Sequence, residues 1–297
     1  MKKIIIDTDL GHDPDDFFAI CYLAAIGVKI DAIVLNPGDL DQIAFANFLV
    51  NKLELDCAIG VSKLDREKCS SGGMYYDLLK GFGYHGSWEK WKNRHDGLGT
   101  DVLYQTYDGS QDILVIGPAT NTAGFIGKAN LDNFKTNIVM QGGFLQYSKN
   151  PYHIPLVDKF IDVESMGTFN LNGDKKAGQK IVETRFNSKR FVGKHICHTI
   201  KLDKSKKFEK KNLASTWFDI GLKTLFEYTD SKKFHDPLAA VCCYYPEIFD
   251  FVKGYPHHVK GGWTSIIDES SDCEVAARVN EDKFWELLTS FKQVENA

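Results

Sequence analysis

The chain has 297 residues, a length that suits one large α/β domain or two smaller ones. Apolar residues make up 43% and charged residues 26%, a globular composition that excludes a disordered protein. The net charge of −4 argues against a nucleic-acid binder with a broad basic face. The seven cysteines form no Cys-x-x-Cys pair, and the sequence has no signal peptide and no apolar stretch near the roughly 18 residues of a membrane span. We therefore expect a cytoplasmic protein with neither nucleic acid nor membrane as partner.

Strand and helix patterns alternate along the first half of the chain. Strands are predicted at residues 4–6, 30–35, 57–61, 113–116 and 138–140, and helices at residues 17–26, 39–53 and 120–128. This alternation predicts an α/β fold: a Rossmann-like, open, mostly parallel β-sheet with helices on both faces.

Residues 64–101 break the alternation with a segment rich in glycine and aromatic side chains, of the kind that forms lids or substrate surfaces. Its aromatic rings could stack on a flat ligand or form a small core of their own. The second half is predicted to contain helices at 174–183, 213–228 and 282–291 and strands at 190–196 and 274–279. With no internal repeat and no linker, residues 1–297 are expected to form a single domain.

A dense group of acids follows the first predicted strand. Five aspartates fall between residues 7 and 16: Asp7, Asp9, Asp13, Asp15 and Asp16. In open parallel sheets ligands bind beyond the carboxyl ends of the strands, where this group lies. Helix capping explains one or two of these acids but not five. Because clustered carboxylates repel one another unless a cation neutralises them, the group predicts a site for Ca²⁺ or Mg²⁺.

Two enzyme families begin with such a strand. HAD-type phosphotransferases carry Asp-x-Asp-x-Thr/Val, whereas Asp9-Leu10 is followed here by Gly11. Residues 7–20 instead resemble the nucleoside hydrolase family, in a variant with a longer loop between the acidic pairs. Later segments resemble further motifs of that family in the same order: Gly117-Pro118-Ala119-Thr120-Asn121, Met140-Gln141-Gly142-Gly143, Thr168-Phe169-Asn170, His235-Asp236-Pro237 and residues 275–284.

The resemblance implies an enzyme of nucleoside salvage that hydrolyses the N-glycosidic bond of a ribonucleoside to ribose and free base. It implies Ca²⁺ bound by Asp9, Asp16, Asp236 and the carbonyl of Thr120, with Asp9 also acting as the general base for a water. It further implies a homodimer or homotetramer.

The resemblance also implies roles at the sugar and the base. Asp15 and Asn170 would hold ribose hydroxyls, and Asp7 would support the carboxylates. His235 is the candidate acid for the leaving base, with His12, His85 or a tyrosine of residues 72–86 as alternatives. Asp13 receives no role.

Two departures from the family pattern bear on the substrate. Thr168 stands where the family commonly has a glutamate near the ribose 5′ end, so we hypothesise a 5′-modified or 5′-phosphorylated substrate. Asn36, in Leu35-Asn36-Pro37-Gly38, stands near the position of the family's Gly-Asn and is the candidate for a further sugar contact. The aromatic segment would suit an unusual or bulky base.

Two other functions stay open at this point. A HAD-type phosphatase would need Mg²⁺ and an aspartyl-phosphate on Asp7. A non-catalytic nucleoside-binding protein of the same fold would have no need for the whole set of acids and His235.

Overall fold

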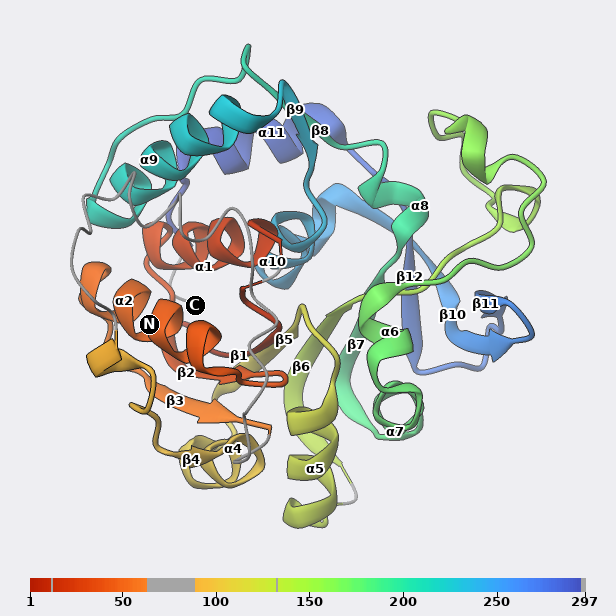
Figure 1. Ribbon diagram of the computed structural model, residues 1–297. Coiled ribbons are helices and arrows are strands. Elements are labelled where there is room, and N and C mark those ends of the chain that lie inside the picture. The colour runs from red at the N-terminus through yellow and green to blue at the C-terminus, as the bar shows by residue number, and fades with distance from the viewer. Residues whose placement is uncertain (12, 63–88, 132, 295–297) are drawn as a thin grey trace.

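The computed structural model describes residues 1–11, 13–62, 89–131 and 133–294. The strands of its main sheet are β1 (Lys3–Thr8), β2 (Lys29–Leu35), β3 (Ala58–Val61), β4 (Gly97–Leu98), β5 (Gln111–Val115), β6 (Phe134–Gln141), β7 (Phe186–Val192), β10 (Phe249–Val259), β11 (Gly262–Ile267) and β12 (Cys273–Val279). Their order is β11-β10-β12-β7-β6-β5-β1-β2-β3-β4 (Figure 1). Every neighbouring pair from β12 to β4 is parallel, whereas β10 is antiparallel to both β12 and β11. A separate hairpin pairs β8 (Lys201–Asp203) with β9 (Ser231–Lys233).

Helices cover both faces of the sheet (Figure 1). One face carries α1 (Asp15–Ala25), α2 (Leu40–Lys52), α8 (Lys194–Cys197), α9 (Leu213–Tyr228), α10 (Asp236–Tyr244) and α11 (Glu281–Ser290). The other carries α4 (Gly99–Thr106), α5 (Thr120–Ala129), α6 (Phe169–Gly173) and α7 (Lys175–Glu183). Short 3₁₀ turns lie at Glu89–Trp91, Tyr147–Lys149, Asp158–Phe160 and Pro246–Ile248.

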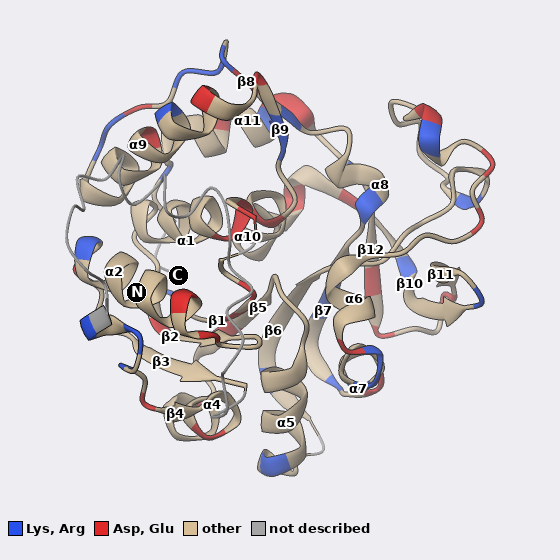
Figure 2. Cartoon of the chain, viewed as in Figure 1, with Lys and Arg blue, Asp and Glu red and all other residues tan. Residues whose placement is uncertain are grey.

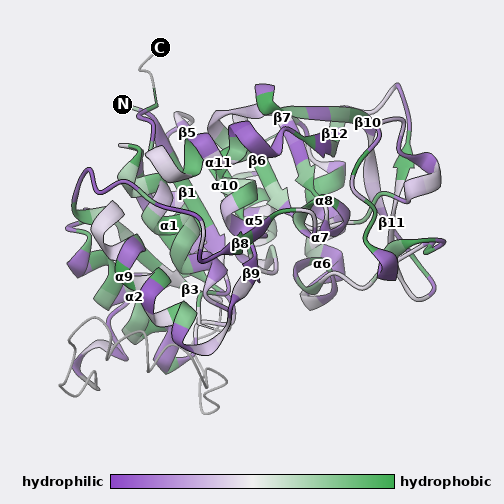
Figure 3. Ribbon diagram, turned by 90° about the horizontal axis from the view of Figure 1, so that it is seen from above, coloured by the Kyte–Doolittle hydropathy of each residue, from purple (hydrophilic) through white to green (hydrophobic). Residues whose placement is uncertain are grey.

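Side chains of a strand point alternately to the two faces of the sheet, so the short strand β1 contributes residues to both hydrophobic cores. Ile4 and Ile6 of β1 pack into the core under α1 and α10, whereas Ile5 packs into the core on the opposite face. Figure 3 shows the same division, with hydrophobic residues concentrated on the strands and on the inner sides of the helices. In the described part of the chain, no helix combines the length and apolarity that crossing a membrane requires.

The predicted fold class, an open and mostly parallel α/β sheet, is confirmed. The strand predicted at 190–196 is placed too late: β7 ends at Val192, and α8 begins at Lys194. The glycine- and aromatic-rich segment at residues 64–101 ends in regular structure, because β4 and the start of α4 occupy residues 97–101. Residues 63–88 of that segment, with their aromatic side chains, lie outside the described residues.

Candidate functional site

A cavity of about 220 Å³ lies at the carboxyl ends of the central strands β1, β5 and β6. Parallel strands present these ends along one edge of the sheet, which is where open α/β folds bind ligands. The cavity is lined by Asp9, Asp13, Asp15, Asp16, Ile116, Gln141, Phe169, Asn170, Lys194, His235 and Asp236. Residues about 220 positions apart in the chain meet here because α1 and α10 pack side by side.

The carboxyl end of β1 is held by hydrogen bonds to the side chain of Asp7. Asn121 Nδ2 and the backbone amide and hydroxyl of Thr122 donate to the two oxygens of Asp7, at distances of 2.7 to 3.0 Å. Asp7 is completely buried, and its burial raises the pKa of its carboxyl to about 6. It supports the acidic turn from beneath and does not line the cavity, so it is not placed to act as the nucleophile that a HAD-type phosphatase requires.

The neighbouring loop reinforces this turn. Gln42 Nε2 donates to the carbonyl oxygen of Asp9 at 3.1 Å, while Gln42 Oε1 accepts from the amides of Gly38 and Asp39. Asp39 caps α2 by accepting from the amides of Asp41 and Gln42. The start of α2 therefore fixes the backbone that carries Asp9.

Three carboxylates in the cavity crowd one another. Burial and then the charge of Asp9 hold the pKa of Asp16 well above its usual range, and burial and the charge of Asp16 do the same to the pKa of Asp236. The pKa of Asp9 is raised to about 7, mainly by burial. Thr8 Oγ1 donates a short hydrogen bond to Asp16 Oδ1. Crowded oxygens of this kind are the ligands that a hard divalent cation prefers.

The case for a bound cation rests on the negative charge and the oxygen atoms of these three carboxylates. In residues 1–11, 13–62, 89–131 and 133–294, no group of three or more His, Cys, Asp or Glu side chains is already arranged to hold a metal ion. The carboxylates thus supply the right atoms and a surplus of negative charge without closing around one point.

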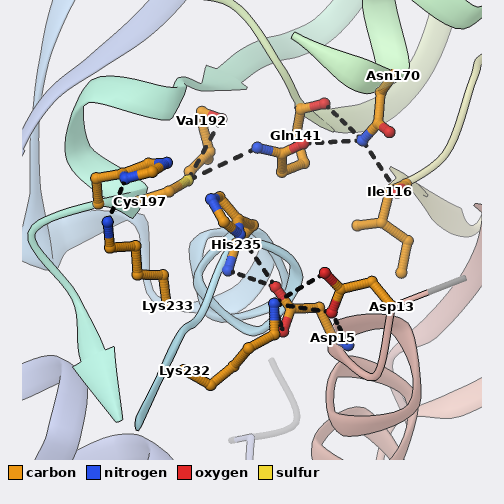
Figure 4. A network of polar contacts seen from close by, with 11 residues as sticks. Asp13, Asp15, Ile116, Gln141, Asn170, Val192, Cys197, Lys232, Lys233 and His235 are labelled. Atoms are coloured by element: carbon orange, nitrogen blue, oxygen red, sulfur yellow. Dashed lines mark hydrogen bonds and ion pairs between the residues drawn. The ribbon is translucent and has the colours of Figure 1, made fainter. Parts of the chain in front are cut away.

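On one side of the cavity, Asp15 joins the acidic turn to β9 and α10 (Figure 4). Its Oδ2 accepts from the backbone amide of His235 at 3.0 Å and lies 3.1 Å from His235 Nδ1. Lys232 Nζ lies 3.3 Å from Asp15 Oδ1 and 2.8 Å from Asp13 Oδ1. Burial acts to raise the pKa of Asp15, but Lys232 and His235 outweigh it and lower the pKa. Asp15 is therefore an ionised carboxylate, and Asp13 is one of the partners of Lys232.

On the other side, Asn170 is held by the ends of two strands (Figure 4). Its Nδ2 donates to Ile116 O at 3.0 Å, to Gln141 O at 3.1 Å and to Gln141 Oε1 at 2.8 Å. Gln141 Nε2 in turn donates to Cys197 Sγ at 3.7 Å. With the amide nitrogen of Asn170 engaged in this way, its Oδ1 is the atom left for a ligand.

The predicted site residues separate into two groups. The structure brings Asp9, Asp15, Asp16, Asn170, His235 and Asp236 to one cavity. Thr120, Asn36 and Thr168 do not line it. Asn36 Nδ2 donates to Thr120 Oγ1 at 2.8 Å, and Thr120 Oγ1 donates to Asp174 Oδ2 at 2.9 Å, so both side chains tie loops together. Thr168 is buried next to Phe169 and Asn170.

Four cavity residues were not predicted from the sequence: Ile116, Gln141, Phe169 and Lys194. A signal existed for Ile116 and Gln141, because Ile116 ends one predicted parallel strand and Gln141 directly follows another, so both had to reach this edge of the sheet. Lys194 carried no signal, because α8 was taken as part of a strand. His12, His85 and the tyrosines of residues 72–86 lie outside the described residues.

Comparisons with known proteins agree with this geometry. Residues 4–286 match the family model described as inosine-uridine preferring nucleoside hydrolase. No curated protein sequence matches the chain. Among solved structures, a plant nucleoside hydrolase superposes with a TM-score of 0.69 at 18% identity, covering 99% of both chains. An inosine-guanosine nucleoside hydrolase gives 0.67 at 16% identity, again over 99% of both chains. A purine-preferring ribonucleoside hydrolase from Gardnerella vaginalis gives 0.64 at 17% identity over 98% of both. These likenesses show the fold, and the family match covers nearly the whole sequence. The chain belongs to the inosine-uridine preferring nucleoside hydrolase family.

Proposed function

We propose that this protein hydrolyses the N-glycosidic bond of a ribonucleoside or of its 5′-phosphate, releasing the free base, as an enzyme of nucleoside salvage. The observation that carries the proposal is the meeting of Asp9, Asp16 and Asp236 with Asn170 and His235 in one cavity. Breaking this bond develops positive charge on the sugar, and a floor of carboxylates beneath the sugar stabilises that charge.

The carboxylates also suit a divalent cation, for which we propose Ca²⁺. Asp9, Asp16 and Asp236 would hold it, and the carbonyl oxygen of Ile116 is better placed than that of Thr120 to join them, because Ile116 lines the cavity. When bound, such an ion supplies orientation and a lowered pKa for the attacking water. Asp9 would take the proton of that water, since its carboxylate lies in the cavity.

Asp15 and Asn170 would orient the sugar. Asp15 Oδ1 is ion-paired with Lys232 Nζ at 3.3 Å but accepts no hydrogen bond of good geometry within the described residues, so it has lone pairs left for a ribose hydroxyl. Asn170 Oδ1 would accept from a second hydroxyl on the opposite side. Both side chains are held by other protein groups, which removes much of the entropy cost of positioning the substrate.

His235 would protonate the leaving base. Its Nδ1 faces Asp15 Oδ2 at 3.1 Å, so an imidazolium ring would donate Nδ1–H to Asp15 and keep Nε2–H for the base. Asp15 thus serves two groups at once, the sugar through Oδ1 and the histidine through Oδ2.

A homodimer or homotetramer in the cytoplasm, with residues 1–297 as a single domain, completes the proposal. The family resemblance supports the assembly.

The test is a screen of ribonucleosides and their 5′-monophosphates for base release, with and without a chelator. We expect release that chelation suppresses, and an Asp9→Ala variant slower by about 10³-fold or more, since it loses both a general base and a ligand. Asp250→Asn, at an exposed ion pair with Arg278, is the control and should keep full activity. Full turnover by Asp9→Ala would contradict the mechanism.

A further inference from the structure

Basic side chains without acidic partners gather on the side of the cavity formed by α8 and β9. Lys194, at the start of α8, lines the cavity, and Lys233 ends β9 just before His235. Lys159 lies nearby, because its ammonium is 5.0 Å from the centre of the Phe160 ring and that ring packs 4.9 Å from the ring of His198. Within the described ranges of the chain, none of these three ammonium groups has a carboxylate within 4.0 Å. Figure 2 shows these basic positions of α8 and β9 around the acidic start of α10.

The strand β9 separates two kinds of lysine. Successive side chains of a strand point to opposite sides, so Lys232 reaches Asp13 and Asp15 while Lys233 points away from them (Figure 4). Lys233 Nζ instead donates to His198 Nδ1 at 2.7 Å. Directly opposite Lys233 in the hairpin lies Lys201, a like charge that destabilises the pair. Lys232 is therefore neutralised by the protein itself, and Lys233 is not.

His198 connects Lys233 to the cavity. It lies one helical turn after Lys194, with its amide bonded to the Lys194 carbonyl, so the two side chains share one face of α8. Its ring is 5.2 Å from the ring of His235, which lines the cavity. Lys194 Nζ donates to the carbonyl oxygen of Gly167 at 3.0 Å, which places the ammonium beside Thr168 and Asn170.

Burial and mutual repulsion both act against these charges. Burial and the charge of Lys233 lower the pKa of Lys194, and burial and the charges of Lys159 and Lys201 lower the pKa of Lys233. Half-buried cations that repel one another destabilise a protein unless an anion joins them. The described chain supplies no such anion, so the ligand is its natural source.

We propose that Lys194 and Lys233, together with Lys159, form a subsite for a phosphate group on the substrate, and that the preferred substrate is a nucleoside 5′-monophosphate. The inference rests on the proposed function, because the carboxylates and Asn170 place the sugar and thereby decide which end of it faces the lysines. The 5′ position follows from Lys194, whose ammonium lies at Gly167, next to Thr168, the residue that the family resemblance places near the ribose 5′ end. A phosphate has three acceptor oxygens and about two negative charges, which suits several ammonium donors.

The first experiment compares kcat/KM for a nucleoside, its 5′-monophosphate and its 3′-monophosphate. We expect the 5′-monophosphate to exceed the free nucleoside by about tenfold or more. Lys194→Met and Lys233→Met should each reduce that ratio by about tenfold, since each removes one charged contact. Lys223→Met, on an exposed face of α9, is the matched control and should leave the ratio unchanged.

A second measurement keeps the test independent of turnover. Inorganic phosphate at low ionic strength should raise the melting temperature of the wild-type protein and of Lys223→Met, but not of Lys194→Met or Lys233→Met. The same melting curves show whether each variant is folded.

The outcomes separate the two proposals. Hydrolysis of nucleosides with no preference for a monophosphate and no binding of phosphate would overturn the subsite and leave the hydrolase. Binding of 5′-monophosphate that depends on Lys194 and Lys233, without base release from any compound, would overturn the hydrolase and keep the subsite. Preference for the 3′-monophosphate would overturn the assignment to the 5′ end.

Discussion

His235 has one ring nitrogen engaged by Asp15, and this geometry makes its role as an acid testable. If Nε2–H protonates the departing base, His235→Ala should slow nucleoside hydrolysis by about 10²–10³-fold. A p-nitrophenyl riboside has a leaving group that needs no proton, so its hydrolysis should fall far less. Steady-state kinetics on both substrates measure the difference.

The control for this comparison is His257→Ala, because His257 is exposed on β10 and should affect neither substrate. Equal losses on the nucleoside and on the p-nitrophenyl riboside would show that His235 acts by positioning Asp15 and not as the acid.

A second histidine, His195, gives the fold a dependence on pH. It is completely buried, with Nδ1 accepting from the amide of Leu145 and Nε2 donating to Ala276 O. Burial lowers the pKa of His195 to about 4, below the roughly 6.5 of an unfolded histidine. The unfolded chain therefore binds the proton first as the pH falls, and the stability from neutral His195, complete above pH 6.5, is lost toward pH 4.

At pH 5 this linkage amounts to about 2 kcal/mol of unfolding free energy relative to pH 7. His195→Gln keeps one donor and one acceptor but does not titrate, so its stability should fall less between pH 7 and pH 5. Urea unfolding at the two pH values measures both proteins. Parallel pH profiles for the wild type and the variant would refute the argument.

At the level of elements, the turn after β1 depends on a close approach by the turn after β5. A Cβ added at Gly117 would collide with the backbone amide of Asp9 and come within 2.6 Å of the carbonyl carbon of Thr8. Backbone atoms cannot rotate away as a side chain can, so Gly117→Ala must displace the acidic turn. We expect it to cost about 1–3 kcal/mol of stability and to remove most of the activity.

Gly127→Ala is the matched control in the same region. A Cβ there has no neighbour within 4 Å, and Gly127 lies inside α5, where alanine is the better helix former. This variant should be as stable as the wild type or more so, by about 0.5–1 kcal/mol, and fully active. Chemical unfolding and base release distinguish the two variants, and an active Gly117→Ala would contradict the proposed packing.

The elements also show where sequence patterns stop being informative. The helix predicted at 213–228 agrees with α9, whose apolar residues recur with helical spacing. The strand predicted at 190–196 was placed too late. The middle of β7 contains two adjacent basic residues, Lys189 and Arg190, which are typical of an exposed segment and not of a buried strand. Lys189 is nevertheless buried, and its ammonium donates to the carbonyl oxygens of Val182 and Thr184 at 2.6 Å. Those acceptors come from a different element, so no local pattern could have indicated them.

Across the whole molecule, some residues of the site could be predicted from local sequence patterns and others could not. The acids after β1 and the pair His235-Asp236 were predicted because chemistry and local motif coincide in the sequence. The lysines of α8 and β9 were not, because their significance lies in having no carboxylate partner among the described residues, and ion pairing is decided by the tertiary fold. Lys232 and Lys233 are neighbours in sequence, yet only one of them faces the aspartates.

The carboxylates of the cavity predict that Ca²⁺ binding changes the thermal stability of the whole protein. Without a cation, burial and mutual repulsion oppose the ionisation of Asp16 and Asp236, as their raised pKa values indicate. Ca²⁺ at about 100 times its dissociation constant would stabilise the folded state by about 2.7 kcal/mol, or roughly 5 °C in melting temperature. Differential scanning calorimetry with Ca²⁺ and with a chelator measures this shift without any substrate.

Replacing Asp16 should have two separate effects, one on the melting temperature with a chelator and one on the response to Ca²⁺. Asp16→Asn removes the unfavourable ionisation of one member of this pair and keeps an acceptor for Thr8, so the chelated variant should melt at or above the temperature of the chelated wild type. The same variant should lose the response to Ca²⁺, because it lacks a ligand. Asp250→Asn, at the surface, should respond as the wild type does. If Asp16→Asn responded fully to Ca²⁺, the cation would have to bind elsewhere, and the carboxylates would act on the substrate alone.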